Sequence, residues 1–261
     1  MEVIVTADYD EMSAVAGEIV IGAIRRKPNV VLGLATGGTP EGLYAALIEA
    51  HKRQGLDFSR VVTFNLDEYV GISPDHEQSY RHFMDSHLFD HINIKSKNTH
   101  VPDGLAENLA AYCEQYERMI QGAGGVDLQV LGIGRDGHLG FNEPGTSLAS
   151  RTQVVTLARE TIEDNSRYFE SEDEVPKFAI TMGVHTILGA RLCLMVANGE
   201  GKADAVKRCV EGPIAAMCTA SALQMHPNVV VVVDEAAASK LERLDYYKWV
   251  QQLKGQLAGK M

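Results

Sequence analysis

Fifteen consecutive residues, 131–145, contain an unusual density of groups that can transfer protons. The segment includes five glycines together with Asp136, His138 and Glu143. An imidazole held by two carboxylates is oriented and made more basic, which suits it to proton shuttling. The apolar run 126–133 is typical of a buried strand, and open α/β sheets bind ligands at the carboxyl ends of their strands. These residues therefore indicate an enzyme with its site at such a strand end.

A second apolar run, residues 29–35, leads into the turn Thr36-Gly37-Gly38-Thr39 and then a helical pattern. Backbone N–H groups and hydroxyls of such a turn can surround a phosphate at the start of a helix. A tight turn that needs glycine only for its φ angles is an equally good interpretation of these two glycines alone. The turn is not a Walker A motif, because no Gly-Lys-Ser/Thr follows it.

A third apolar run, residues 61–66, ends in the adjacent carboxylates Asp67 and Glu68. Successive strand residues point to opposite faces, so we expect at most one of the two to face a pocket while the other caps a helix or pairs. A carboxylate that is partly desolvated at a strand end has a raised pKa and can act as a general base. Taken alone, a helix cap or a solvated turn would be the better interpretation.

Two cations are candidates for binding a phosphate. Lys202 lies in a turn after the apolar run 191–197, and Arg167 lies in the polar, acid-rich stretch 159–177. The composition of that stretch predicts a mobile lid at about residues 158–178. An exposed arginine on the surface is the commoner meaning of a residue such as Arg167.

Each of these motifs is weak alone. However, the glycine turn, the Asp67-Glu68 pair, the segment around His138 and the turn with Lys202 all follow apolar strands, so we expect them to meet at one edge of one sheet. The combined inventory is a phosphate cradle, a separate carboxylate and a histidine flanked by carboxylates. Such a set suits aldose–ketose chemistry on a phosphosugar, in which one group moves a proton to the ring oxygen and another removes a proton beside a carbonyl. No cofactor motif accompanies it, and we expect neither an organic cofactor nor a metal.

The spacing Gly132-x-Gly134-x-x-Gly137 formally matches a dinucleotide-binding fingerprint. That fingerprint must open a helix and be followed about 20 residues later by an acid at the end of the next strand. Here Pro144-Gly145 cuts the segment short and the next predicted strand ends at Leu157. We therefore reject a dinucleotide site.

The remaining elements alternate between strand and helix, which predicts one α/β domain over residues 1–261. Apolar periodicity predicts one closing helix over 236–257, and Thr181 is expected to cap the start of a helix. Further strands are expected at 2–6, 152–157 and 228–234, and further helices at 10–26, 79–88 and 105–121.

Composition excludes several other classes of protein. The formal net charge of −11 is spread along the chain and leaves no basic face for nucleic acid or an anionic membrane. No segment could span a bilayer and the N-terminus lacks a signal-peptide pattern, so we expect a cytoplasmic protein. The four cysteines lack CxxC spacing and are expected to be reduced. His87 and His91 have a spacing that could hold a metal, but no carboxylate completes such a site.

Five segments resemble the glucosamine-6-phosphate deaminase family nearly end to end. They are Thr36-Gly-Gly-Thr-Pro40, Val62-Thr-Phe-Asn-Leu-Asp-Glu-Tyr-Val-Gly71, Gly134-Arg-Asp-Gly-His-Leu-Gly-Phe-Asn-Glu-Pro144, Ser147-Leu-Ala-Ser-Arg-Thr152 and Asn165-Ser-Arg167. The resemblance implies a three-layer α/β/α sandwich with a modified Rossmann-like, mostly parallel sheet. It also implies a cofactor-free hydrolase of a carbon–nitrogen bond, which converts glucosamine 6-phosphate and water to fructose 6-phosphate and ammonia in amino-sugar catabolism and N-acetylglucosamine degradation.

The resemblance also implies residue roles. His138 would open the pyranose, with Asp136 and Glu143 holding and charging it, and Asp67 would remove the C2 proton and help to expel the amine. The residues expected to bind the substrate phosphate are Thr36, Gly37, Gly38, Thr39, Arg167 and Lys202.

Two departures from the hexameric, allosterically activated members concern regulation. Those members carry basic residues where this chain has Gln153 and Val155, which argues against activation by N-acetylglucosamine 6-phosphate. We also expect the chain to end close to its last helix, without the longer C-terminal tail of those members, which favours a monomer, with a homo-oligomer as the alternative.

Two other functions fit parts of the pattern. A related 6-phosphogluconolactonase-like hydrolase would use the same phosphate cradle but would not need Asp67 for enolisation. A non-catalytic sugar-phosphate-sensing domain would need a DNA-binding segment that this sequence does not contain, and its catalytic positions would be free to vary.

Overall fold

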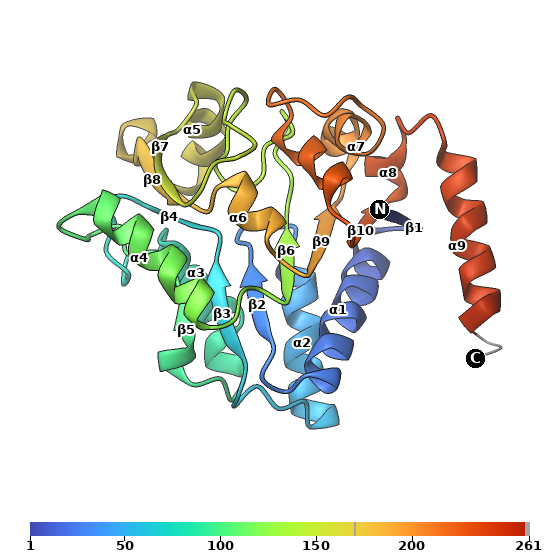
Figure 1. Cartoon of the computed structure of the whole chain (residues 1–261), viewed down its shortest axis with the longest axis horizontal. Coiled ribbons are helices and arrows are strands. Elements are labelled where there is room, and N and C mark those ends of the chain that lie inside the picture. Colours follow the sequence, from blue (N-terminus) through green and yellow to red (C-terminus); the bar gives the residue numbers. More distant parts are fainter. Residues whose placement is uncertain (170, 259–261) are drawn as a thin grey trace.

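A computed structural model describes residues 1–169 and 171–258 of the chain. Seven strands form a sheet in which every neighbouring pair is parallel, and helices cover both of its faces (Figure 1). This arrangement agrees with the predicted three-layer α/β/α sandwich. In spatial order the strands are β1 (Glu2–Thr6), β10 (Val229–Asp234), β9 (Leu192–Ala197), β6 (Leu128–Leu131), β2 (Val31–Leu34), β3 (Val62–Asn65) and β5 (Thr99–His100).

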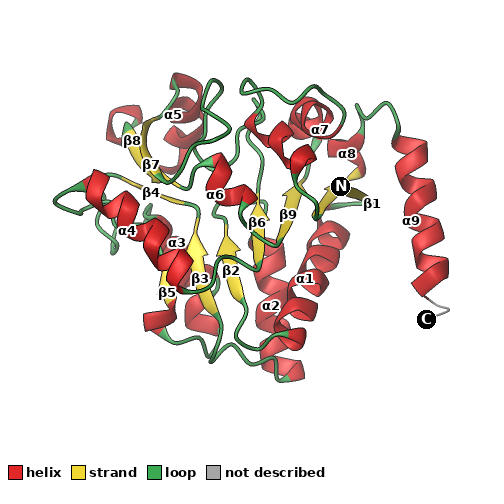
Figure 2. Cartoon of the chain, in the orientation of Figure 1, coloured by secondary structure: helices red, strands yellow, loops and turns green. Residues whose placement is uncertain are grey.

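The strand sequences explain why the sheet lies in the middle of the molecule. β2 and β6 are buried at every position, and β10 contains five consecutive valines. Strands covered on both faces need such continuous apolar runs, and β-branched side chains pack well on a pleated surface. Figure 2 shows the strands of this sheet side by side, with loops above their carboxyl ends.

Two apolar clusters hold the helices against the sheet, one on each face. The first lies under α1 (Tyr9–Arg26), α2 (Glu41–Gln54) and α3 (Tyr80–His87). The second lies under α4 (Leu109–Gly122), α6 (Val184–Leu188), α7 (Ala203–Val210) and α8 (Glu235–Ala238). Short 3₁₀ segments complete the covering layers: η1 (Phe89–His91), η2 (Ser96–Asn98), η5 (Glu200–Lys202) and η6 (Thr219–Met225).

A second, antiparallel sheet was not predicted. It has the order β4 (Asp67–Tyr69), β8 (Phe178–Thr181) and β7 (Gln153–Thr156). The expectation that Thr181 starts a helix is wrong, because Thr181 ends β8, which is paired on both sides. Helix α6 begins only at Val184, with Gly183 as its N-cap.

The single closing helix predicted for 236–257 is also wrong. The structure has the short helix α8 and, after a break, α9 (Leu244–Ala258), which contacts the edge strand β1 (Figure 1). The carboxylate of Glu211 accepts hydrogen bonds from the backbone N–H groups of Glu242 (2.8 Å) and Arg243 (2.9 Å). These donors lie just before α9, so a side chain from another part of the chain supplies acceptors that a continuous helix would supply itself.

The region predicted as a lid joins β7 to β8. It contains α5 (Arg159–Asn165), η3 (Ser166–Tyr168) and η4 (Glu172–Glu174), while Glu170 lies outside the described residues. The backbone N–H of Leu157 donates to the carbonyl of Lys177 at 3.0 Å, so the two ends of the region lie side by side.

Two compositional expectations can be compared with the structure. All four cysteines are buried and free of disulfides, as expected for reduced thiols. Among the residues that the structure describes, no helix combines the length and apolar character needed to cross a bilayer.

Candidate active site

A cavity of about 800 Å³ lies at the carboxyl ends of β2, β3, β6 and β9. Pockets for small ligands have volumes of roughly 300 to 1,000 Å³, so the cavity can hold a hexose phosphate. Asp136 and Glu143 do not line the cavity and lie behind His138. The predicted site residues that do line it are Thr36, Gly37, Gly38, Thr39, Asp67, His138, Arg167 and Lys202.

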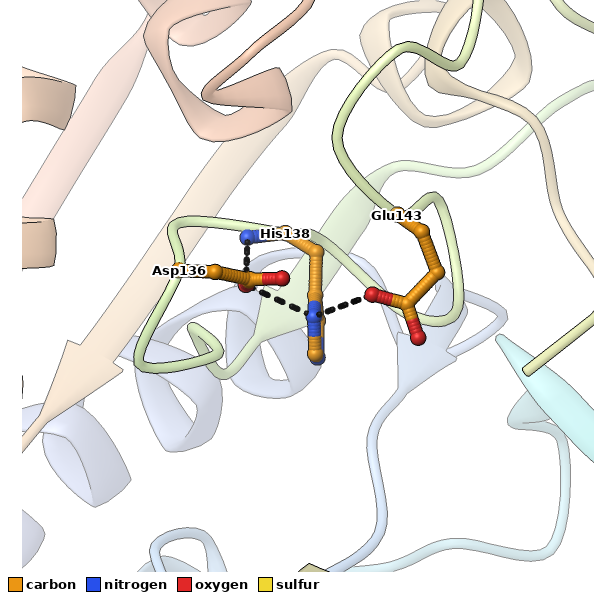
Figure 3. A group of neighbouring side chains, drawn as sticks. All are labelled: Asp136, His138 and Glu143. Atoms are coloured by element: carbon orange, nitrogen blue, oxygen red, sulfur yellow. Dashed lines mark hydrogen bonds and ion pairs between the residues drawn. The ribbon is translucent and has the colours of Figure 1, made fainter. Parts of the chain in front are cut away.

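The two carboxylates approach the same nitrogen of His138 from either side (Figure 3). Nδ1 lies 2.8 Å from Oδ1 of Asp136 and 3.2 Å from Oε2 of Glu143. The geometry is that of an ion pair shared between two acceptors, with the nitrogen between them. The same Asp136 oxygen accepts the backbone N–H of His138 at 3.0 Å, which fixes the turn as well as the ring.

Glycine at position 134 is required by the imidazole. A Cβ atom there would lie 2.4 to 2.6 Å from three ring atoms of His138, far inside contact distance. Gly137 has a φ of +89°, a conformation that favours glycine, and its N–H closes the turn on Gly134. Gly134 and Gly137 therefore serve to place His138. This role differs from the one that glycines have in a dinucleotide fingerprint.

The environment of His138 favours its protonated form. Burial of the imidazole acts to lower its pKa, but the hydrogen bonds and charges of Asp136 and Glu143 outweigh burial and raise the pKa to about 9. The same contacts hold the pKa of Asp136 below its usual value, against the opposing effect of its own burial. At neutral pH the ring therefore carries a proton that it can deliver into the cavity.

Asp67 is a buried carboxylate just after β3, and only 6% of its surface is exposed. Burial, reinforced by the charge of Glu68, raises the pKa of Asp67 to about 7, although the charge of His138 acts in the opposite direction. Gly140, with a φ of +56°, lies so close that a Cβ atom there would be 3.1 Å from Oδ2 of Asp67. A carboxylate with a pKa near 7 is suited to act as a general base.

Glu68 faces away from Asp67 and caps a helix. Its two oxygens accept backbone N–H groups from Tyr69 at 2.9 Å and from Tyr80 and Arg81 at 3.0 Å each. The last two donors are in the first turn of α3, where N–H groups lack partners within the helix. The alternation predicted for the Asp67-Glu68 pair is confirmed.

The glycine turn after β2 faces the cavity at the start of α2. Gly37 has a φ of +94°, and Thr39 donates its hydroxyl to Oδ1 of Asn198 at 2.9 Å. Lys202 reaches across from the end of β9 to donate to the carbonyl of Ile133 at 2.7 Å. Backbone N–H groups at a helix start beside a lysine can bind a phosphate.

Several cavity residues were missed by sequence reasoning. Tyr9 holds the glycine turn, because its hydroxyl donates to the carbonyl of Gly38 at 3.1 Å and accepts the N–H of Gly42 at 2.8 Å. An aromatic wall consists of Tyr69, Tyr80, Phe141 and Phe169. Thr161 and Asn165 also line the cavity from α5. Tyr69, Phe141 and Asn165 lie in segments that carry the family resemblance. The other four, Tyr9, Tyr80, Thr161 and Phe169, lie in none of these segments.

One group of metal-ligand types occurs among the described residues. Ligand atoms of Asp136, His138 and Glu143 lie within 4.8 Å of one another. Nδ1 of His138 already lies between the two carboxylates, so their ion pairs with the charged imidazole account for this group, which we call the histidine triad.

Comparisons with known proteins agree on one family. The family described as glucosamine-6-phosphate isomerases/6-phosphogluconolactonase matches residues 9–232. A glucosamine-6-phosphate deaminase of Hahella chejuensis is 54% identical over 251 residues, which cover 96% of each chain. A glucosamine-6-phosphate deaminase of Thermoanaerobacter pseudethanolicus is 52% identical over 239 residues, which cover 92% of this chain and 94% of that protein.

Solved structures give the same result at the level of the fold. A protein described as a monomeric glucosamine-6-phosphate deaminase superposes with a TM-score of 0.90 at 48% identity, covering 92% of this chain and all of that one. A 6-phosphogluconolactonase from Trypanosoma brucei gives a TM-score of 0.74 at 19% identity, covering 92% of this chain and 98% of that chain. The second likeness concerns the fold alone.

Proposed function

The chain belongs to the glucosamine-6-phosphate isomerase/6-phosphogluconolactonase family, and from that premise we propose that it converts glucosamine 6-phosphate and water to fructose 6-phosphate and ammonia. Relatives more than half identical over nearly their whole length carry the name glucosamine-6-phosphate deaminase. The observation that carries the proposal is Asp67, a buried carboxylate with a raised pKa in the same cavity as the charged His138. Hydrolysis of a lactone does not require such a second base.

The substrate phosphate binds at the glycine turn, and this part of the proposal rests on the start of α2. Thr36, Gly37, Gly38 and Thr39 line the cavity there. Arg167 and Lys202 bring positive charge to the same cavity in a chain whose net charge is −11. A phosphate monoester carries about −1.5 to −2 charges, so it needs these local cations.

His138 opens the sugar ring. It delivers a proton to the ring oxygen and takes up the proton that the C1 hydroxyl loses, so the bond between C1 and the ring oxygen breaks, an open-chain aldehyde forms and the imidazole recovers its charge. Asp136 and Glu143 keep the imidazole charged and oriented for this transfer. The raised pKa of His138 supports this role, because the acid is present at neutral pH.

Asp67 carries out the isomerisation. As a carboxylate it removes the proton from C2, next to the aldehyde, and forms an enolic amine. Return of a proton at C1 gives an imine at C2, to which water adds, and ammonia leaves to give the ketone of fructose 6-phosphate. The oxygen of the new carbonyl comes from water and the nitrogen departs as ammonia, so the reaction needs no oxidant.

An ammonia assay on the purified chain tests the function. Incubation with glucosamine 6-phosphate should release ammonia and fructose 6-phosphate in equal amounts. The chain should not accelerate the hydrolysis of 6-phosphogluconolactone. Ammonia release with and without N-acetylglucosamine 6-phosphate should be the same, since Gln153 and Val155 replace the basic residues of activated relatives. Lactone hydrolysis without ammonia release would identify the chain as a lactonase.

We infer one catalytic domain over residues 1–261, with residues 158–178 as a lid over the cavity. A monomer is favoured by the likeness to a solved deaminase described as monomeric. We infer a cytoplasmic location from the phosphorylated substrate. Light scattering tests the monomer, and cell fractionation tests the location.

A further inference from the structure

The two oxygens of Glu143 have different partners. Oε2 lies 3.2 Å from Nδ1 of His138, inside the triad. Oε1 accepts the hydroxyl of Thr161 at 2.6 Å and the backbone N–H of Ala158 at 3.3 Å. The carboxylate therefore connects the histidine to the first turn of α5, which lies in the lid segment.

Thr161 is placed to act through this carboxylate. It is 8% exposed, lies on α5 and borders the cavity. The backbone N–H of Ala158, the N-cap of α5, bonds to Glu143; in a capping box this N–H bonds to a Glu or Gln at the third helical position, which here is Thr161. The hydrogen bonds that dock α5 are therefore the same ones that hold the carboxylate of Glu143 in place.

A second contact holds the other end of α5 without involving Glu143. The side-chain amide of Asn165 donates to the hydroxyl of Tyr69 at 2.9 Å, and Tyr69 packs against Phe169 and Phe141. The described residues of the lid segment therefore include separate attachments to the histidine triad and to the aromatic wall. This arrangement allows the two attachments to be removed separately.

We propose that Thr161 is a positioning residue through which the docked lid segment holds Glu143 against His138. The terminal torsion of a glutamate is soft, so a carboxylate bonded through one oxygen rotates easily. With Oε1 fixed by α5, Oε2 stays directed at Nδ1. When α5 moves away, Glu143 loses both donors, whereas Asp136 keeps its contact with the backbone of His138. The movement of α5 that encloses the substrate thereby also aligns His138.

The consequence for His138 follows from the charges that face it. Asp136 and Glu143 both raise its pKa, and Asp67 is a further ionisable group that interacts with it. Removal of the Thr161 hydroxyl leaves Asp136 and Asp67 in place and loosens only Glu143. The pKa of His138 should then fall, because one of its two attracting carboxylates is less well directed.

Three variants separate this role from simple packing of the lid. Thr161→Val keeps the shape and removes the hydroxyl, Thr161→Ser restores a hydroxyl, and Asn165→Ala releases the attachment at Tyr69. The His138 resonance, assigned by comparison with His138→Gln, is titrated by NMR in the substrate-free enzyme. Rates of ammonia release give kcat and KM for each variant.

For Thr161→Val we expect a lower pKa of His138 and a fall in kcat of about tenfold or more, since small misplacements of a catalytic group cost this much. Thr161→Ser should restore both. Asn165→Ala should raise KM and leave the His138 titration unchanged. If valine perturbs folding, seen as a loss of cooperative thermal unfolding, Thr161→Ala serves in its place.

An unchanged His138 titration in Thr161→Val, or the same change in Asn165→Ala, would overturn the proposal. The inference rests on the proposed function for the meaning of kcat, but its titration arm does not. A wild-type chain that releases no ammonia would disprove the function, while the titration would still decide whether Thr161 acts on His138 through Glu143.

Discussion

Two aspartates, one before the start of a strand of the parallel sheet and one after the end of a strand, have opposite properties: Asp127 is half-buried and Asp67 is buried. Asp127, just before β6, accepts hydrogen bonds from Lys27 (2.7 Å), Arg191 (2.8 Å) and the backbone N–H of Val31 (2.8 Å). These partners outweigh burial and lower its pKa. Asp67, just after β3, has its pKa raised to about 7 by burial and by the charge of its neighbour.

The difference shows how one sheet provides both stability and chemistry. At the edge where strands begin, Asp127 connects the end of α1, the start of β2 and the residue before β9 through two ion pairs and one backbone hydrogen bond. At the edge where strands end, Asp67 is kept at a cost in folding free energy, because its charged form is desolvated. We expect substitutions to affect stability at the first edge and catalysis at the second.

The largest effect is expected for Asp67→Asn. The change removes the base and little volume, so kcat should fall by roughly 10³-fold while phosphosugar binding persists. The folded-state pKa of Asp67 is raised, so its stabilising contribution is present below the unfolded pKa and is lost as pH rises toward about 7. The variant should therefore gain in Tm relative to wild type between pH 4 and pH 7. Substantial remaining ammonia release would show that Asp67 is not the base.

A large effect is also expected for Gly134→Ala. The new methyl group would need the space of the imidazole, so His138 must move and kcat should fall by about 10²-fold. Gly122→Ala is the matched control, because no neighbouring atom lies within 4 Å of a Cβ there. Equal activity of the two variants would mean that the position of the ring does not matter.

A smaller effect is expected in the pH profile. The rate constant kcat/KM should rise with ionisation of Asp67 near pH 7 and fall with deprotonation of His138 near pH 9. Asp136→Asn removes a partner that raises the pKa of His138, so the alkaline limb should move to lower pH. An alkaline limb that stays in place would assign it to another group.

The smallest effect on activity is expected for Asp127→Asn. Ammonia release should be unchanged, while the free energy of unfolding falls by about 1–2 kcal/mol, because Lys27 and Arg191 are largely exposed and lose little. The pKa of Asp127 is lowered, so its contribution is present above the unfolded pKa and disappears as pH falls through the folded one. Urea unfolding at pH 7 and pH 3 measures both points. A loss of activity without loss of stability would remove the contrast with Asp67.

The sequence predicts most of the strands of the parallel sheet, and it predicts that the motifs after four of them lie at the same edge. The apolar runs before Thr36, Asp67, Asp136 and Asn198 become β2, β3, β6 and β9, which are neighbours in the sheet. This succeeds because strands buried on both faces have a continuous apolar pattern, and because parallel strands end at one edge. The flanking of His138 by two carboxylates also follows from local sequence.

The parts that sequence could not provide depend on partners distant along the chain. Strand β4 has only three residues, and its structure comes from pairing with β8, more than 100 residues later. The break before α9 depends on Glu211, which supplies the acceptors for two N–H groups. Thr161 has no motif of its own, because its role arises only from contact with Glu143.

The segment between β7 and β8 has one further consequence. Thr156 pairs with Phe178, and Leu157 bonds Lys177, so the segment leaves the small sheet and returns to it at the same place. An insertion with adjacent ends can change in length or be exchanged for that of a homologue while the register of its host strands is preserved. Selectivity among amino-sugar phosphates can therefore diverge, in nature or by grafting, as long as the exchanged segment keeps a hydroxyl at the place of Thr161 to hold Glu143.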